Sequence, residues 1–196
     1  MSVRLGNVLA AIDEANARDP MPADADGKTL PRALLYGRRM SAALAEFAPD
    51  APEVLRIAVR AQHIERWIIP RASYPEGRIA YLKWRKDLQH HHAKRCGELM
   101  RAAGYDEDDI GKVGALLRKE ALKYDPLTQT LEDVICLVFL QYEAPEFIAL
   151  HDDDKVRDIL AKTARKMSPA GLASAGKLTL GPRLAKLLAE ALAIES

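Results

Sequence analysis

Apolar residues recur at every third and fourth position along nearly the whole chain, and alternation at every second position is scarce. This spacing places apolar side chains on one face of an α-helix, whereas a half-buried strand would need a period of two. The segment that starts near Asp50 shows the clearest stripe: Val54, Ile57, Ala61, Ile64 and Ile68. The pattern therefore predicts an all-α fold, a single compact multi-helix bundle.

The chain has 196 residues, of which 48% are hydrophobic and 29% charged, as expected for one globular domain. We find no internal repeat and no linker long enough to divide it. We therefore predict a single domain over residues 1–196. It would have N-terminal helices in 1–49, a core in 50–150 and C-terminal helices in 151–196.

Prolines, glycines and capping residues predict where individual helices begin and end. Asp50 and Glu53 form a capping box, so we expect a helix from Asp50 to the break at Pro70. Residues 20–29 are rich in proline, glycine and aspartate and are expected to form a loop. Asp106 is expected to cap a further helix.

Signals for a membrane or for export are missing from the sequence. The longest uninterrupted apolar run, residues 134–140, has seven residues, whereas a membrane-spanning helix needs roughly 20. The N-terminal segment has neither a secretory h-region nor the composition of a transit peptide. Cys96 and Cys136 are too few for a disulfide framework. We therefore expect a cytosolic protein without a membrane partner.

A net charge of +1 conceals an uneven distribution. Residues 56–101 carry 11 basic and 4 acidic side chains, whereas residues 102–154 carry 4 basic and 13 acidic ones. Either these segments neutralise one another across the folded surface, or the basic segment binds an anion. The anion would be a small phosphorylated ligand or, less favoured because the pI is only 7.8, RNA.

His63 is the first candidate site residue, because it falls at the margin of the apolar stripe beside Arg66 and Trp67. A histidine in this setting either binds a metal ion or a phosphate, or packs with its ring satisfied by a backbone carbonyl. The sequence leaves both roles open.

Residues 90–92 are three consecutive histidines, which point about 100° apart on a helix. Only His92 continues an apolar stripe with Leu88, so we expect it to face the interior. Asp87 and His91 stand four residues apart and would form a surface hydrogen bond or share an ion. Otherwise the first two histidines belong to a solvated face.

Glu132 and Asp133 place an acidic pair at the start of a strongly apolar helix, which is predicted to begin near Thr130. Asp133 would close a capping box from Thr130, and Glu132 would interact with the positive end of the helix. A role in a binding site is the alternative for both residues.

From His63 onward, this order of residues resembles the HD superfamily of metal-dependent phosphohydrolases. In these all-α domains a histidine, a His-Asp pair and a later aspartate hold one or two metal ions. His63 resembles the first ligand, Lys86-Asp87 occupies the position of the His-Asp pair, and Asp133 resembles the last aspartate. The resemblance implies an HD-like core in residues 50–150.

Lys86 stands where the superfamily has the paired histidine. An ammonium group about 4 Å from a cation is repelled by roughly 4 kcal/mol per unit charge at an effective dielectric of about 20. Either His91 or His92 would then supply the missing imidazole, or the fold has lost its metal.

Over nearly its full length, the chain also resembles the family called domain of unknown function 4202, which brings no established activity. The segments that carry this likeness are 36–40, 60–63, 67–71, 74–75, 81–85, 129–133 and 166–169.

These residues favour a divergent HD-like hydrolase of a small phosphorylated or nucleotide substrate, with divalent Mn, Fe or Mg as cofactor. The expected metal ligands are His63, Asp87, His92 and Asp133. The expected catalytic groups are Glu132 and Lys86. The expected substrate-binding residues are Arg66, Arg85, Arg118, Lys119, Trp67 and Trp84. The alternative is a non-catalytic module that binds a nucleotide or RNA on a degenerate HD-like fold.

Overall fold

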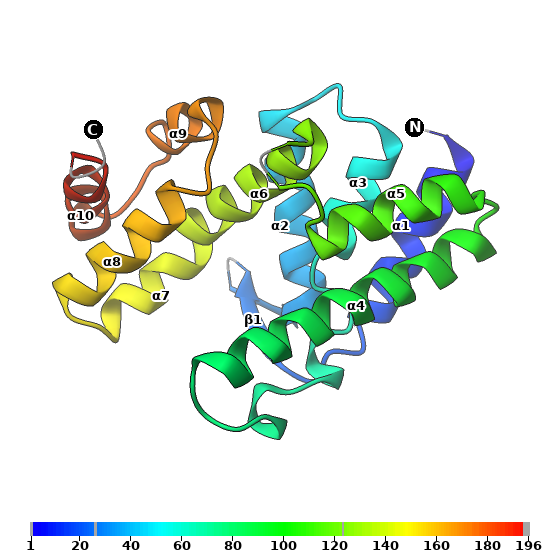
Figure 1. The fold of residues 1–196 in the computed structure, drawn as a ribbon, viewed down its shortest axis with the longest axis horizontal. Helices are drawn as coiled ribbons and strands as arrows, with labels where there is room; N and C mark the ends of the chain where they lie inside the picture. Colours follow the sequence, from blue (N-terminus) through cyan, green and yellow to red (C-terminus); the bar gives the residue numbers. More distant parts are fainter. Residues whose placement is uncertain (1, 26, 123, 194–196) are drawn as a thin grey trace. The chain divides into compact units, whose positions relative to one another are not determined.

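The computed structural model describes residues 2–25, 27–122 and 124–193 (Figure 1). Helices account for 72% of the structure, which confirms the predicted all-α class. Packing divides the chain into two compact units, Met1–Leu122 and Lys123–Ser196. The boundary between the units falls inside the segment predicted to be the core, and the single domain with its three parts stays a prediction.

In its described residues, the first unit contains five α-helices: α1 (Val3–Asn16), α2 (Arg32–Phe47), α3 (Glu53–Ala61), α4 (Arg78–Ala102) and α5 (Glu107–Arg118). Helices α4 and α5 run side by side, and α3 packs against α1, α2 and α5 (Figure 1). Fully buried side chains from these helices and from the turn after α3 form the core: Leu5, Ile12, Met40, Leu55, Ile57, Ile64, Met100 and Leu117.

Residues 20–29 do not form the predicted loop. Strands β1 (Pro22–Ala25) and β2 (Lys28–Pro31) pair in an antiparallel hairpin between α1 and α2. Gly27 takes a φ of 79°, a conformation that glycine adopts without the steric cost of a Cβ. The turn-forming residues of this segment therefore connect two strands of a hairpin. The strands are too short to show an alternation of apolar and polar residues in the sequence.

The helix predicted from Asp50 to Pro70 is shorter than expected. Its N-cap is Pro52 with no side-chain cap, and Glu53 instead accepts hydrogen bonds from Ser2 Oγ at 2.5 Å and Tyr105 Oη at 2.9 Å. The capping box was therefore a wrong prediction. After α3 the chain turns and continues through two 3₁₀ helices, η1 (Arg66–Ile68) and η2 (Arg71–Ser73).

Glu65 explains why α3 cannot extend to Pro70. Its backbone is left-handed, with φ 49° and ψ 35°, and such a residue cannot continue a right-handed helix. Its amide N–H donates to the buried Asn16 Oδ1 at 3.0 Å, which holds this conformation. His63 therefore lies in a turn after α3, and not on the helix face that the sequence predicted.

The start of α5 agrees with the cap predicted at Asp106. Gly104, with φ 85°, follows α4, and Asp106 caps α5 by accepting a hydrogen bond from the Asp109 amide at 2.8 Å. Lys119, at the C-terminal end of α5, is left-handed with φ 57°.

The second unit contains α6 (Pro126–Val138), the π-helical segment η3 (Phe139–Glu143), α7 (Ala144–Ala149), α8 (Asp153–Ala164), α9 (Pro169–Ala175) and α10 (Pro182–Ala193). Helix α6 is capped by Asp125 and begins four residues before Thr130, so the capping box from Thr130 to Asp133 was a wrong prediction. After α6 the chain continues through η3, and Pro145 lies in the first turn of α7.

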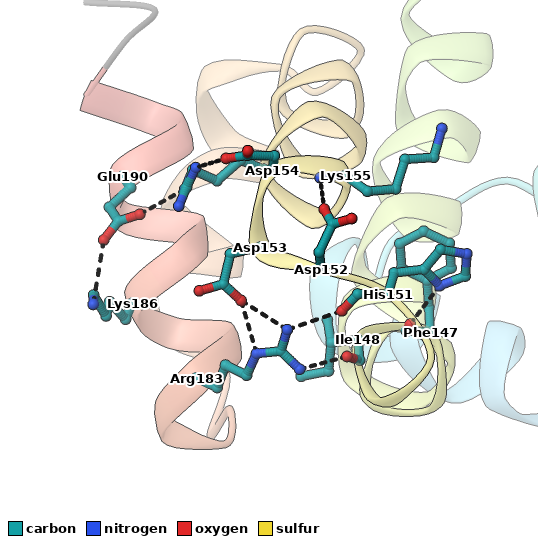
Figure 2. Close-up of polar contacts among 11 residues, drawn as sticks. Phe147, Ile148, His151, Asp152, Asp153, Asp154, Lys155, Arg183, Lys186 and Glu190 are labelled. Carbon is teal, nitrogen blue, oxygen red and sulfur yellow. Dashed lines mark hydrogen bonds and ion pairs between the residues drawn. The ribbon is translucent and has the colours of Figure 1, made fainter.

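Arg183 ties three helices of this unit together (Figure 2). From α10 it donates to Asp153 Oδ1 at 2.7 and 3.0 Å, at the start of α8. It also donates to the carbonyl oxygens of Ile148 at 2.5 Å and His151 at 2.9 Å, near the end of α7. Isolated surface ion pairs stabilise little, but a guanidinium with four acceptor contacts fixes geometry.

Candidate functional site: a histidine surrounded by cations

The turn after α3 holds His63 within a group of aromatic and cationic side chains, all in the first unit. The half-buried His63 ring stacks on Tyr36 of α2, with centroids 4.0 Å apart and planes inclined by 17°. Arg66 Nη1 lies 3.4 Å from His63 Nε2. The ring centroid of His92, on α4, lies 6.1 Å from that of His63. We call this group, with Arg85 and Lys119, the His63 cluster.

These surroundings lower the pKa of His63 well below its ordinary value. Burial is the largest cause, followed by the positive charge of Arg66 and by smaller contributions from His92, Lys119 and Arg85. His63 is therefore neutral at pH 7. A guanidinium can only donate, so Nε2 accepts from Arg66 and the ring proton resides on Nδ1. Cations beside a neutral N–H donor are the groups that bind an anion.

Arg85 and Lys86 are neighbours in sequence but occupy different surroundings. Arg85 is half-buried, contributes to the potential at His63, and places its guanidinium 5.9 Å from the ring centroid of Tyr81. Lys86 is exposed, and in the described part of the chain it makes no hydrogen bond or ion pair. The 100° step between helical residues turns one side chain toward the cluster and the other toward solvent.

The two tryptophans predicted to stack on a ligand differ in burial. Trp84 is buried, and its Nε1 donates to the carbonyl oxygen of Ile69 at 2.8 Å. The guanidinium carbon of Arg66 lies 4.8 Å from the centroid of the Trp84 ring. Trp84 therefore positions Arg66 through a cation–π contact. Trp67, in η1, is half-buried.

Glu65 and Asn16 support the turn that carries His63 and Arg66. The Glu65 carboxylate, almost fully buried, accepts two bonds from Arg95 Nε at 3.1 and 3.2 Å and lies 3.7 Å from His91 Nε2. The sequence predicted a role for neither residue. The sequence does offer one signal, because Asn16 follows the apolar residues of α1. A buried amide needs hydrogen-bond partners, so a buried Asn16 indicates a contact with another segment.

The residues predicted to hold a metal ion have other partners. Asp87 accepts hydrogen bonds from Tyr74 Oη at 2.7 Å and Lys83 Nζ at 2.6 Å, and not from His91 as the sequence suggested. His92 faces the interior, as predicted, and its Nδ1–H donates to a backbone carbonyl at 2.7 Å. No three His, Cys, Asp or Glu side chains of the described residues form a group that could hold a metal. The donor set does not fit a metal centre, and we derive no step through one.

Asp133, in the second unit, joins α6 to the start of α9. Its Oδ1 accepts from the Ser168 amide at 2.7 Å and from Gln129 Nε2 at 3.2 Å, and its Oδ2 accepts from Ser168 Oγ at 2.6 Å. A Cβ at Gly171 would lie 2.5 Å from Asp133 Oδ1, so glycine is needed for this approach. These bonds give Asp133 a structural role that the sequence did not predict.

The other predicted site residues are placed as follows. Glu132 is buried, with Lys166 Nζ 3.8 Å from its Oε1. Arg118 lies against Gly114 and donates to Glu120 Oε1 at 2.6 Å, which engages it locally. Lys119, in contrast, contributes its charge to the His63 cluster.

The fold defines an all-α protein, and the His63 cluster gives it a neutral histidine among cations. The sequence model described as "Domain of unknown function (DUF4202)" matches residues 6–188, and the chain belongs to this family. The predicted family is thereby confirmed, whereas the resemblance to the HD superfamily stays a prediction. No curated protein and no solved structure matches the chain. Within the described residues, every helix is too short or too polar to cross a membrane.

Proposed function

We propose that this protein binds the phosphate of a small ligand, such as a nucleotide, at the His63 cluster. The observation that carries this proposal is the set of positive charges, from Arg66, Arg85 and Lys119, that acts on a half-buried neutral histidine. Arginine offers planar paired donors to phosphate oxygens, lysine offers a point charge, and His63 Nδ1 adds a neutral donor.

Arg85 connects this phosphate site to an aromatic surface. Tyr81 is 42% exposed, and the guanidinium of Arg85 lies 5.9 Å from its ring centroid. A ligand with a phosphate on Arg85 could therefore stack a base on Tyr81. Base–aromatic stacking contributes about 1–3 kcal/mol and tolerates different bases. This arrangement favours a nucleotide over inorganic phosphate.

Binding is better supported than metal-dependent hydrolysis. Hydrolysis as predicted from the sequence needs a metal-bound water, and the predicted ligands Asp87 and His92 are engaged in other hydrogen bonds. The binding proposal uses only charges and donors that the first unit holds together.

Isothermal titration with AMP, ADP, ATP and inorganic phosphate tests the proposal. A charged hydrogen bond contributes about 1.5–3 kcal/mol, so Arg85→Ala should weaken nucleotide binding by roughly ten- to a hundredfold. Lys86→Ala removes the same charge one residue away, from an exposed position, and serves as the matched control. Equal losses in both variants would show a general charge effect, and a parent protein that binds none of these ligands would refute the proposal.

A further inference from the structure

A cavity of about 260 Å³ lies among α1, α2 and α3, at residues that the His63 cluster does not use. Leu5 and Leu9 of α1 and Leu44 and Ala45 of α2 form much of its apolar wall. Arg56 and Arg60, four residues apart on α3, also line it. Apart from Ser41, these two arginines are the only polar side chains that line the cavity in the described residues.

Arg60 is a half-buried cation whose donors are poorly satisfied. Its side chain is only 15% exposed, and burial lowers the pKa of its guanidinium. Its Nε lies 3.3 Å from Asp13 Oδ1 but is not aligned for a hydrogen bond. Among the described residues, no hydrogen bond engages the rest of this guanidinium. Because Nε is buried without a hydrogen bond, this charged group is incompletely satisfied, and an anionic ligand on the rest of the guanidinium would offset that cost.

The charges around the cavity do not balance. Asp13 is shared, because Arg38 Nε also lies 3.5 Å from its Oδ2. Arg56 already donates to two backbone carbonyls at 2.7 Å each. Two guanidinium groups, those of Arg38 and Arg60, therefore share one carboxylate. Arg60 is the cavity-lining arginine whose guanidinium makes no hydrogen bond in the described part of the chain.

Gly37 of α2 makes room for the Arg60 side chain. A Cβ at this position would lie 3.2 Å from Arg60 Cδ and 3.0 Å from the Arg60 carbonyl oxygen. Segments 36–40 and 60–63, both part of the family likeness, thus meet beside the cavity. Arg60 and Gly37, which come from these two segments, have no role in the His63 cluster.

We propose that this cavity binds a small carboxylate with an apolar chain or ring. Its carboxylate pairs with the Arg60 guanidinium in the paired N–H···O geometry that arginine favours, and its apolar part packs against Leu5, Leu9 and Leu44. A single accessible guanidinium at apolar walls suits a monocarboxylate better than a phosphate. The site is separate from the proposed nucleotide site and does not depend on it.

Titration of the full chain with straight-chain carboxylates, from butyrate to octanoate, and with the matching alcohols tests the proposal. Octanoate is expected to bind, and affinity should rise about fourfold per added methylene until the cavity is full. Octanol should bind at least about tenfold more weakly, because it leaves the Arg60 charge unpaired. Equal affinities for octanol and octanoate, or no binding of octanoate, would overturn the proposal.

Filling the cavity gives a second test. Ala45 is exposed and lines the cavity, so Ala45→Phe should place a ring in it. Ala42 is also exposed on α2 but does not line the cavity, so Ala42→Phe is the matched control. Octanoate binding should be lost in the first variant and kept in the second, while nucleotide binding is unchanged in both. Arg60→Met should weaken octanoate but not octanol. Octanoate bound equally by both phenylalanine variants would place it elsewhere and overturn the proposal.

Discussion

Burial keeps several histidines of this protein uncharged at neutral pH. It lowers the pKa of His92 to about 3, and it is the largest cause of the lowered pKa of His63 and His91. An imidazolium in these positions would lose its hydration, and nearby cations add to the cost. His63, His91 and His92 therefore contribute neutral donors and acceptors, and not positive charge, to the first unit.

The buried His92 should make stability fall in acid. The unfolded chain protonates this side chain below about pH 6.5, whereas the folded protein does so only near pH 3. Between these values the unfolded state binds the extra proton, so the free energy of unfolding falls by about 1.4 kcal/mol per pH unit for this group. Above pH 6.5 its contribution is complete.

Urea unfolding of the parent and of His92→Gln, at intervals from pH 7 to pH 4, measures this effect. The variant keeps an amide donor for the Ile64 carbonyl but has no group that titrates. Its free energy of unfolding should depend less steeply on pH, by about 1.4 kcal/mol per unit below pH 6. Parallel curves for the two proteins would contradict the assignment.

At the scale of elements, the turn between α3 and η1 depends on a side chain of α1. Asn16→Ala removes the acceptor of the buried Glu65 amide, which should destabilise the protein by about 1–3 kcal/mol. It should also weaken nucleotide binding, because His63 and Arg66 lie on this turn. Asn7→Ala, at an exposed position of the same helix, is the control for urea unfolding and for titration. An Asn16 variant as stable as this control would show that the bond is dispensable.

The contact between α6 and α9 depends on the absence of a side chain at Gly171. In Gly171→Ala the new Cβ would meet Asp133 Oδ1 at 2.5 Å and displace a buried carboxylate that holds Ser168. We expect a loss of about 1–3 kcal/mol in the free energy of unfolding. Gly176→Ala, in the same segment, has right-handed φ and nearest atoms at 3.6 and 3.7 Å, and should change stability little. Equal effects of the two substitutions, measured by urea unfolding, would argue against this role of Asp133.

Sequence patterns predicted the helices where local signals decide the structure. The cap at Asp106 and the inward face of His92 follow from neighbours within one helix, and both predictions are confirmed. The turn at Glu65 could not be predicted in this way, because its partner Asn16 is 49 residues away in sequence. The role of Asp133 was missed for the same reason, since Ser168 lies 35 residues further along the chain.

For the whole molecule, the uneven charge of the sequence is partly cancelled within the first unit. This unit has 20 basic and 17 acidic residues, a net charge of +3, and the second unit has 9 and 11, a net charge of −2. Arg101 of the basic segment pairs with Glu107 of the acidic one, and Lys83 pairs with Asp87 within the basic segment. The basic segment therefore offers fewer cations to a partner than its composition suggests.

This cancellation bears on the alternative that the basic segment binds RNA. For single strands, the logarithm of the binding constant falls with the logarithm of salt concentration by about 0.7 per phosphate neutralised. If binding used the 11 basic residues of segment 56–101, the slope would be about −8, whereas the three cations of the His63 cluster would give about −2. Because Lys83, Arg95 and Arg101 of this segment have acidic partners, we expect weak binding of an oligouridylate, a slope no steeper than about −2, and competition by AMP. Fluorescence anisotropy across a salt series measures all three. Tight binding with a slope near −8 would instead make the whole basic segment an RNA-binding surface, and phosphate recognition at His63 would be one contact among many.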